Sequence, residues 1–247
     1  MNRKLNKLFS QLKIRKNQNI IFHSNIAGIL QFNKLNKNNA CSYLFNYLKK
    51  KITNKGTLLV PTYNYDFTKG AAFNLKKTPS QVGFFSNYLL KKYYSKRTPN
   101  PVFSHLVFNP TNNFNKDISH NYAFGTKSIF NKLLLNKFKI ICFCCSTDRI
   151  TFLHHIENLM NVEYRFLKKF KGKLIDNNKK YNIDYNYFVA KKNIKHAIRE
   201  NKINNLIDDK FFIEKNFGRF KCYSVDANML ASKLLKKIKN NIYYLIK

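Results

Sequence analysis

An apolar run leads through a polar turn into a helix-like segment in the stretch Ile141-Cys142-Phe143-Cys144-Cys145-Ser146-Thr147-Asp148-Arg149-Ile150-Thr151-Phe152-Leu153-His154-His155-Ile156-Glu157. Residues 138–145 are apolar except for Lys139, which predicts a buried strand. Polar residues 146–151 follow, and a helix is expected to begin near Thr151. A strand that ends in a polar turn before a helix is where open α/β sheets carry their sites. We therefore expect a functional site at this turn.

The helix carries a histidine and a glutamate three residues apart. At this spacing the side chains of His154 and Glu157 lie on one helix face. A carboxylate beside an imidazole favours the protonated ring, which suits a proton acceptor near neutral pH. The alternative is a packed core histidine beside a solvated helix charge, because structural ion pairs are common. The adjacent His155 points to another face and is expected to be structural.

The chain is strongly basic. Its 247 residues include 46 Lys and Arg against 12 Asp and Glu, for a formal net charge of +34. This balance favours anionic partners, such as nucleic acid or a polyanionic cofactor. However, Asn, Lys, Ile, Phe and Tyr are all abundant, which is the set that A+T-rich codons encode, and no nucleic-acid-binding motif accompanies the charge. A dedicated nucleic-acid function is therefore not expected.

The five cysteines indicate a reducing compartment. Three of them, Cys142, Cys144 and Cys145, fall in the predicted buried strand, where they behave as small apolar residues. The spacing gives neither a disulfide framework nor a zinc site, and no metal site is predicted. The basic N-terminus has no long apolar core typical of a signal peptide, and no apolar run is long enough to span a bilayer. We expect a cytoplasmic protein without a membrane partner.

Strands and helices alternate through the first two thirds of the chain. Strands are predicted at residues 20–23, 56–62, 102–108 and 138–145, and helices at 1–15, 41–51, 84–94, 129–136 and from 151. This order predicts a three-layer α/β/α fold with a mostly parallel central sheet. A smaller α+β C-terminal portion, about 165–247, is expected from a strand at 181–189, a helix at 193–201, a hairpin at 211–224 and a final helix at 225–244. We expect a single domain over residues 1–247.

Short blocks along the chain resemble the antibiotic N-acetyltransferase family, typified by aminoglycoside 3-N-acetyltransferases. In order, the blocks are His23-Ser24-Asn25-Ile26-Ala27-Gly28, Gly56-Thr57-Leu58-Leu59-Val60-Pro61-Thr62, Thr78-Pro79-Ser80 with Gly83, Arg97-Thr98-Pro99-Asn100-Pro101, Gly125 with Ser128, and Thr151-Phe152-Leu153-His154-His155-Ile156-Glu157. Six blocks in one order are specific, although each alone is weak. Three departures concern substrate identity more than fold: Asn25 and Thr98 stand at usual serines, and Asn100 stands at a usual histidine.

The resemblance implies direct transfer of an acetyl group from acetyl-CoA to a primary amine of an amino sugar. His154 matches the family histidine that removes the proton of the attacking amine, and Glu157 would orient that ring or raise its basicity. The charge that forms on the thioester oxygen needs a donor. Backbone N–H groups in the turns at Ser24-Asn25 or at Thr62 could supply it.

The turns before two helices resemble the coenzyme A side of the family's site, because their N–H groups and a guanidinium suit a pyrophosphate. The expected residues are Ser24, Asn25, Gly28, Ser80, Gly83, Arg97 and Thr98. For the turns alone the alternative is an ordinary loop that caps a helix, and for Arg97 it is a surface charge.

The acceptor is expected near Asp66 and Asp148, two of the few acids close to the motifs. So few acids suit a polycationic aminoglycoside poorly, and an anionic, nucleotide-linked amino sugar would suit the positive charge better. Two other classes stay open. One is an acyl hydrolase or acyltransferase with Cys144 or Cys145 as nucleophile beside His154. The other is a non-catalytic descendant that binds a nucleotide or nucleic acid. The oligomeric state is not predicted.

Overall fold

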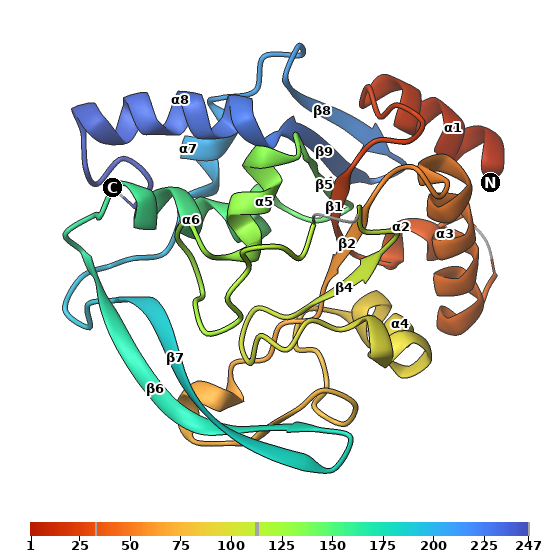
Figure 1. The fold of residues 1–247 in the computed structure, drawn as a ribbon. Coiled ribbons are helices and arrows are strands. Elements are labelled where there is room, and N and C mark those ends of the chain that lie inside the picture. The colour runs from red at the N-terminus through yellow and green to blue at the C-terminus, as the bar shows by residue number, and fades with distance from the viewer. Residues whose placement is uncertain (33, 112–113, 247) are drawn as a thin grey trace.

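Three parallel strands form the centre of the main sheet. The computed structural model describes residues 1–32, 34–111 and 114–246. Strand β1 (Ile20–Ser24) lies between β2 (Leu58–Pro61) and β5 (Lys139–Phe143) and pairs with both in parallel (Figure 1). The carboxyl ends of all three strands therefore meet at one edge of the sheet, where open α/β sheets carry their sites.

Antiparallel strands extend the sheet on both sides. β4 (His105–Phe108) pairs with β2, β9 (Phe220–Asp226) pairs with β5, and β8 (Phe212–Phe217) pairs with β9. Within the described residues the sheet has six strands in the order β4-β2-β1-β5-β9-β8. Because β8 is antiparallel to β9 and β9 to β5, β8 runs with the three central strands. The expected α/β class with a mostly parallel central sheet is confirmed.

Successive residues of the central strands are buried on opposite faces of the sheet. In β1, Ile21 packs into one hydrophobic cluster, whereas Ile20 and Phe22 pack into the other. In β5, Ile140 and Ile141 divide in the same way. Strands that are buried on both faces are apolar throughout, which is why the run at 138–145 predicted this strand.

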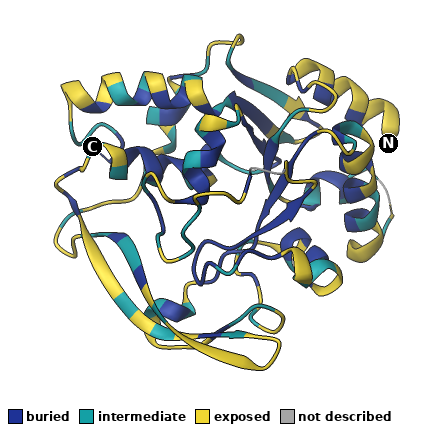
Figure 2. Ribbon diagram, viewed as in Figure 1, coloured by how far each residue is buried: buried dark blue, intermediate teal, exposed yellow. Residues whose placement is uncertain are grey.

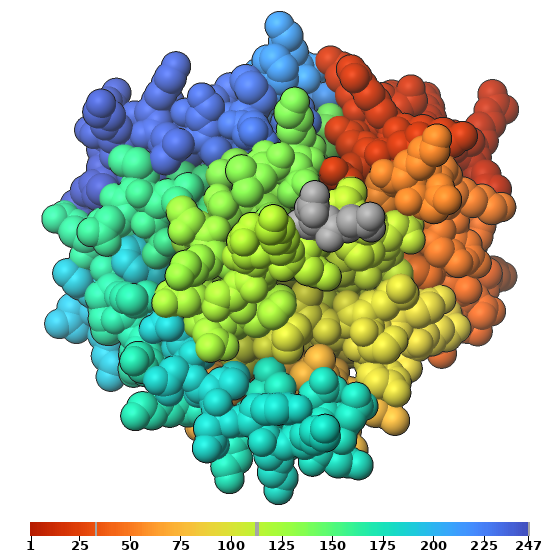
Figure 3. All heavy atoms as spheres, in the orientation of Figure 1, coloured from red at the N-terminus to blue at the C-terminus, as the bar shows by residue number. Residues whose placement is uncertain are grey.

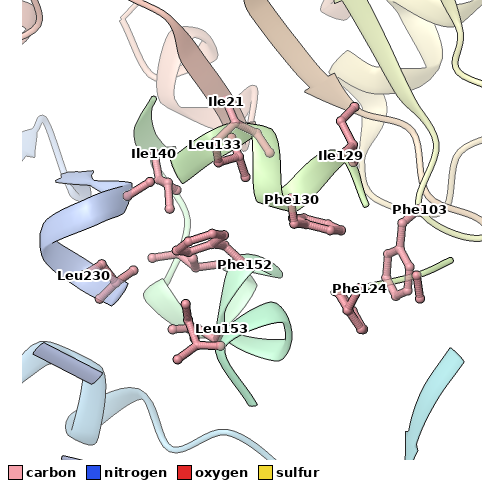
Figure 4. Packing of buried hydrophobic residues seen from close by; sticks show 14 of the residues in the cluster. Ile21, Phe103, Phe124, Ile129, Phe130, Leu133, Ile140, Phe152, Leu153 and Leu230 are labelled. Carbon is pink, nitrogen blue, oxygen red and sulfur yellow. The ribbon is translucent and has the colours of Figure 1, made fainter. Parts of the chain in front are cut away.

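Helices cover both faces and complete the three layers (Figure 1). One cluster is packed by α1 (Asn2–Gln11), α2 (Ala27–Leu30), α3 (Lys37–Ile52) and α4 (Phe84–Tyr93). The other is packed by α5 (Ile129–Leu135), α6 (Phe152–Leu159), α7 (Glu200–Asn204) and α8 (Ala227–Asn240). Figure 4 shows Phe130 of α5, Phe152 of α6 and Leu230 of α8 in this second cluster. None of the helices in the described part of the chain has the length and apolarity needed to cross a bilayer.

A second sheet lies beside the first and consists mainly of one long hairpin. Its order is β3 (Phe73–Asn74), β6 (Arg165–Asp176) and β7 (Lys179–Ala190). The hairpin is largely exposed (Figure 2), and its side chains, cyan in Figure 3, cover one end of the molecule. Short 3-10 helices precede or follow strands at η1 (Asp66–Lys69), η2 (Tyr94–Lys96) and η3 (Thr147–Arg149).

The C-terminal third contributes to both sheets. Its first strands, β6 and β7, build the hairpin, whereas β8 and β9 add to the main sheet beside β5. Two predicted helices are shorter than expected. Residues 193–199 are not helical and α7 begins at Glu200, because the preceding backbone is held by a tertiary bond from Arg199 N–H to Leu245 O. The final helix begins at Ala227, since Val225 still pairs with Ile140 in the sheet.

Gly28 is required by packing against the end of β5. A Cβ at this position would lie 2.2 Å from Cys144 Sγ and 2.9 Å from Cys144 Cβ. Gly28→Ala should therefore lower the free energy of unfolding by about 1–3 kcal/mol, the usual cost of overpacking a core, as measured by urea denaturation.

A double-mutant cycle tests this explanation. In Gly28→Ala/Cys144→Ala the obstructing thiol is removed, so the combined loss should be smaller than the sum of the two single losses. Cys144→Ala alone is the matched control. Strictly additive losses would contradict the contact as the cause.

Candidate active site

A cavity of about 370 Å³ opens at the carboxyl edge of the three parallel strands. Its wall includes the end of β1, the segment after β2, the turn before α4, and the turn and helix after β5. The residues that matter most for chemistry are His23, Ser24, Tyr63, Gln81, Asp148 and His154. The turn that follows residues 141–145 thus lies at a cavity, as its sequence predicted.

His154 lies in the wall of this cavity, on the first turn of α6. Its side chain is 25% exposed, and Nδ1 is 2.6 Å from Glu157 Oε2. The predicted pairing of these two residues on one helix face is confirmed. Arg165 Nη2 lies 3.0 Å from the same Nδ1. Nδ1 cannot donate to the carboxylate and accept from the guanidinium at once. We assign the proton to Nδ1 because the charge-assisted contact is shorter, which leaves the Nε2 lone pair free.

Glu157 is fully buried behind His154 and is held from three directions. Tyr164 donates a hydrogen bond of 2.7 Å to Oε1. Arg165 Nε lies 2.8 Å from Oε2, a close ion pair whose angle is outside hydrogen-bond geometry. Burial alone would raise the pKa of Glu157, but the contacts with His154, Arg165 and Tyr164 outweigh it and hold the pKa below its usual value of 4.5. The carboxylate is therefore ionised at neutral pH.

A second cavity, of about 380 Å³, meets the first at His154. The two cavities share Asp148, His154 and Tyr187 in their walls, and the second adds Arg165 and His196. The imidazole therefore stands between two spaces, each large enough for part of a substrate. A ring enclosed by apolar side chains would have excluded a catalytic role.

His155 is a core residue. It is 0% exposed, and its Nδ1 accepts a hydrogen bond of 3.2 Å from Gly125 N–H. Burial lowers the pKa of His155 to about 4, so the ring is neutral. The expected structural role of His155 agrees with this position.

The first predicted coenzyme A turn contributes one cavity residue. Ser24 lines the first cavity. Asn25 uses its side chain to accept from Ala27 N–H and its own N–H to donate to Phe143 O. Gly28 packs on Cys144, away from the cavity lining. In this structure Asn25 and Gly28 serve the turn and its packing, and their contact with coenzyme A stays a prediction.

In the second predicted turn, at residues 78–83, the first cavity is lined by neighbours of the expected residues. Ser80 is buried, and its Oγ accepts a hydrogen bond of 3.2 Å from Val82 N–H. Gly83, at φ +118°, is the residue before α4 and permits a backbone conformation that other residues rarely adopt. Gln81, Val82 and nearby Ser86 line the cavity instead. Ser80 and Gly83 therefore shape the turn that presents them.

Arg97 is buried and does not reach either cavity. Its guanidinium donates to Ser104 Oγ, and to the carbonyl oxygens of Thr62, Thr78 and Leu75, over 2.6–3.2 Å. Burial lowers the pKa of Arg97 to about 10, so the group stays charged at neutral pH. Ser104 and backbone carbonyls occupy the donors of Arg97 in this structure, and its contact with pyrophosphate stays a prediction.

Thr98 also has a structural role. It is buried, and its Oγ1 accepts a hydrogen bond of 2.9 Å from His105 N–H at the start of β4. Its expected contact with coenzyme A stays a prediction. Asn100, which stands at a usual histidine of the family, accepts from Val102 N–H, Phe103 N–H and Tyr185 O–H. This site needs an acceptor of several hydrogen bonds, which an amide oxygen supplies.

The two predicted acceptor-binding acids are separated. Asp148 lines both cavities, and its carboxylate contacts Ser146 Oγ and Arg149 Nε, the latter at 3.5 Å. Asp66 lies outside the lining of both cavities. It accepts from Gln81 Nε2 at 2.9 Å, and this bond holds the pKa of Asp66 below its usual value. The carboxylate of Asp66 holds Gln81 in the cavity wall, and its contact with substrate stays a prediction.

Two N–H groups in the turns that were expected to supply the oxyanion donor are already engaged. Asn25 N–H donates to Phe143 O, and Thr62 N–H donates to Ser104 O, each at 2.9 Å. This excludes them as donors to a thioester oxygen. His23, the last but one residue of β1, lines the cavity, and burial lowers its pKa to about 4. Its neutral ring carries an N–H that could donate instead.

The cysteines differ in their access to the cavity. Cys144 is buried with its Sγ 3.5 Å from Cys222 Sγ, and the hydrogen bond to Cys222 and burial raise its pKa, so it is a thiol. Cys145 is half-buried and lines the first cavity. All five cysteines are free. In the part of the chain that the structure describes, no group of three or more His, Cys, Asp or Glu residues could hold a metal ion.

Several cavity residues were not predicted from the sequence. Arg165 lies in a lysine-rich segment and contacts Glu157 only because β6 starts beside α6. Tyr187 comes from β7, far along the chain. His23 was visible as the first residue of a family block, and that position was the available signal.

Comparison with known proteins identifies the family. The protein-family model described as aminoglycoside 3-N-acetyltransferase matches residues 21–238, which is most of the chain. No curated protein matches the chain at the sequence level. The fold is shared with solved structures of low sequence identity.

Three of these structures cover nearly the whole chain. The YokD protein from Bacillus subtilis is 14% identical, with a TM-score of 0.77, and the match covers 98% of this chain and 94% of that one. AAC-IIIb with CoASH is 14% identical, with a TM-score of 0.77, covering 97% and 96%. AAC-VIa with sisomicin bound is 15% identical, with a TM-score of 0.78, covering 97% of each chain. The chain therefore belongs to the aminoglycoside 3-N-acetyltransferase family and is an acetyl-CoA-dependent N-acetyltransferase, as the six sequence blocks predicted.

Proposed function

We propose that this enzyme transfers the acetyl group of acetyl-CoA directly to a primary amine of an amino sugar, with His154 as general base. The position of His154 carries the proposal: its ring lies between two cavities, and Glu157 fixes Nδ1 from behind. An imidazole that donates through Nδ1 offers Nε2 as an acceptor. Sisomicin on AAC-VIa supports the amino-sugar class.

His154 and Glu157 have separate roles in the reaction. Nε2 of His154 takes a proton from the amine while the amine nitrogen attacks the thioester carbonyl. The carbon–nitrogen bond forms, the carbon–sulfur bond breaks, and the proton on Nε2 is then available to the departing thiolate. Glu157 stabilises the imidazolium that exists between these two transfers, because its carboxylate stays ionised.

We assign the reacting thioester and the attacking amine to the junction of the two cavities at His154. The first cavity is bounded by Ser24 and by Gln81, Val82 and Ser86 at the beginning of α4. His23 lies in the same wall, and we propose that its neutral ring donates a hydrogen bond to the developing oxyanion. The CoASH complex of AAC-IIIb supports coenzyme A as the leaving group.

We also propose that residues 1–247 work as one domain in the reducing cytoplasm. Two clusters packed on opposite faces of one sheet support a single folding unit. Cys144 and Cys222 support a reducing compartment, because their sulfurs lie 3.5 Å apart and form no disulfide bond.

His154→Ala should lower kcat for acetyl transfer by about 10²–10⁴-fold, the usual contribution of a general base. The measurement is thiol release from acetyl-CoA with a panel of amino sugars. His120→Ala is the matched control, because His120 is partly buried but lines neither cavity. It should retain the wild-type rate.

The same experiment separates the other classes of function. Loss of activity in Cys145→Ala but not in His154→Ala would indicate a thiol nucleophile instead of a general base. An absence of thiol release with every amine tested would contradict the proposed reaction as a whole.

Glu157→Gln should show a pH-dependent loss of stability. The folded protein holds the pKa of Glu157 below its usual value of 4.5. The ionised carboxylate therefore stabilises the fold above that pH, and the contribution disappears as the pH falls through the folded-state pKa. The difference in free energy of unfolding between wild type and Glu157→Gln should be largest near pH 7 and should shrink below about pH 4.5, as measured by urea denaturation across this range.

Asp184→Asn provides the control for surface charge. Asp184 pairs with Lys169 at 3.5 Å, and both side chains are more than half exposed. Such a pair is worth about 0–1 kcal/mol, so this variant should differ little from wild type. A Glu157→Gln difference that stays constant with pH would contradict an ionised carboxylate in the fold.

A further inference from the structure

The cavities around His154 have no spare carboxylate for a polycationic acceptor. In the described residues, Asp148 is the one acid in the lining of either cavity. It already contacts Ser146 Oγ and Arg149 Nε. Glu157, behind His154, is fully buried and is committed to Arg165, Tyr164 and the imidazole itself.

Two further acids lie close to these walls but are also engaged. Asp66 accepts from Gln81 and pairs with Lys69 at 3.5 Å. Glu200, at the start of α7, accepts from Thr147 N–H at 3.4 Å. Neither side chain lines either of the two cavities at His154. An incoming ammonium group would therefore meet carboxylates that already have partners.

The cationic groups are placed differently. Arg149 lines the first cavity with its side chain 70% exposed, and among the described residues its one ion pair is made through Nε, which leaves two terminal amino groups for a ligand. Arg165, which is paired with Glu157, lines the second cavity. Around them the chain carries a net charge of +34. Such a field repels a polycation during encounter and attracts an anion, and a desolvated ammonium without a carboxylate partner is costly.

We propose that the natural acceptor is an amino sugar with one reactive amine and an anionic group, a phosphate or a nucleoside diphosphate, that Arg149 binds. This proposal rests on the function proposed above. The guanidinium of Arg149 suits a phosphate because its donors can bind two oxygens together. Asp148, which lines both cavities, would then accept a hydrogen bond from the single ammonium group, which loses one proton to solvent before Nε2 of His154 takes the next during attack.

Four acceptors that differ in charge test the proposal. The probes are glucosamine, glucosamine 6-phosphate, uridine diphosphate glucosamine and sisomicin, and the readout is kcat/KM from thiol release with saturating acetyl-CoA. At least one of the two anionic sugars should exceed both glucosamine and sisomicin by about tenfold, the factor expected for one charge-assisted hydrogen-bonded pair. The anionic sugar with the higher kcat/KM shows whether the bound group is a sugar phosphate or a nucleoside diphosphate. The advantage should shrink as salt is raised, because screening weakens exposed charges.

Arg149→Gln tests the residue. It should lower the ratio of kcat/KM for the better anionic sugar to that for glucosamine by about tenfold. Lys236→Gln makes the same change of charge on the exposed face of α8, away from both cavities, and should leave this ratio at the wild-type value.

The outcomes separate this proposal from the reaction itself. Thiol release that is fastest with sisomicin, or equal for glucosamine and both anionic sugars, would overturn the anionic acceptor and leave the acetyl transfer standing. An equal fall of the ratio in Arg149→Gln and Lys236→Gln would overturn Arg149 as the binding group. No release with any acceptor would instead overturn the proposed function.

Discussion

The site depends on the contacts that the buried carboxylate of Glu157 makes with its neighbours. This carboxylate is completely buried, and a buried charge is tolerated only when partners surround it. His154, Tyr164 and Arg165 supply those partners, and the last two come from the segment that turns from α6 into β6. The same contacts that stabilise the charge therefore hold the imidazole against the cavity and fix the start of the hairpin beside it.

A second buried charge, on Arg97, supports the loops that border the first cavity. Arg97 lies over the ring of Phe73 and donates to carbonyl oxygens of Thr62, Leu75 and Thr78. These carbonyls belong to the loop after β2 and to the turn that leads toward α4. Because their hydrogen bonds converge on one guanidinium, the loops that border the first cavity have a common anchor. A residue of a family block thus serves the site through the backbone around it.

The charges of the site are balanced although the chain is not. Asp148 with Arg149, and Glu157 with Arg165, form two pairs of opposite sign around His154. The excess of lysine lies elsewhere on the chain. A basic surface with a locally neutral cleft brings anions to the protein by long-range attraction, while the contacts inside the cleft decide which group is bound.

The sequence by itself determined the strands of the main sheet, the layers and the helix that carries His154 and Glu157, because apolar runs and helical spacing are local properties. It could not assign the roles of Arg97 and Thr98, since a motif position does not reveal whether a side chain faces a cavity or a neighbouring backbone. Tertiary structure alone brought Arg165 to Glu157 and Tyr187 to the cavity wall. Those contacts join segments whose meeting depends on how the hairpin packs against the sheet, and no periodicity in the chain encodes that.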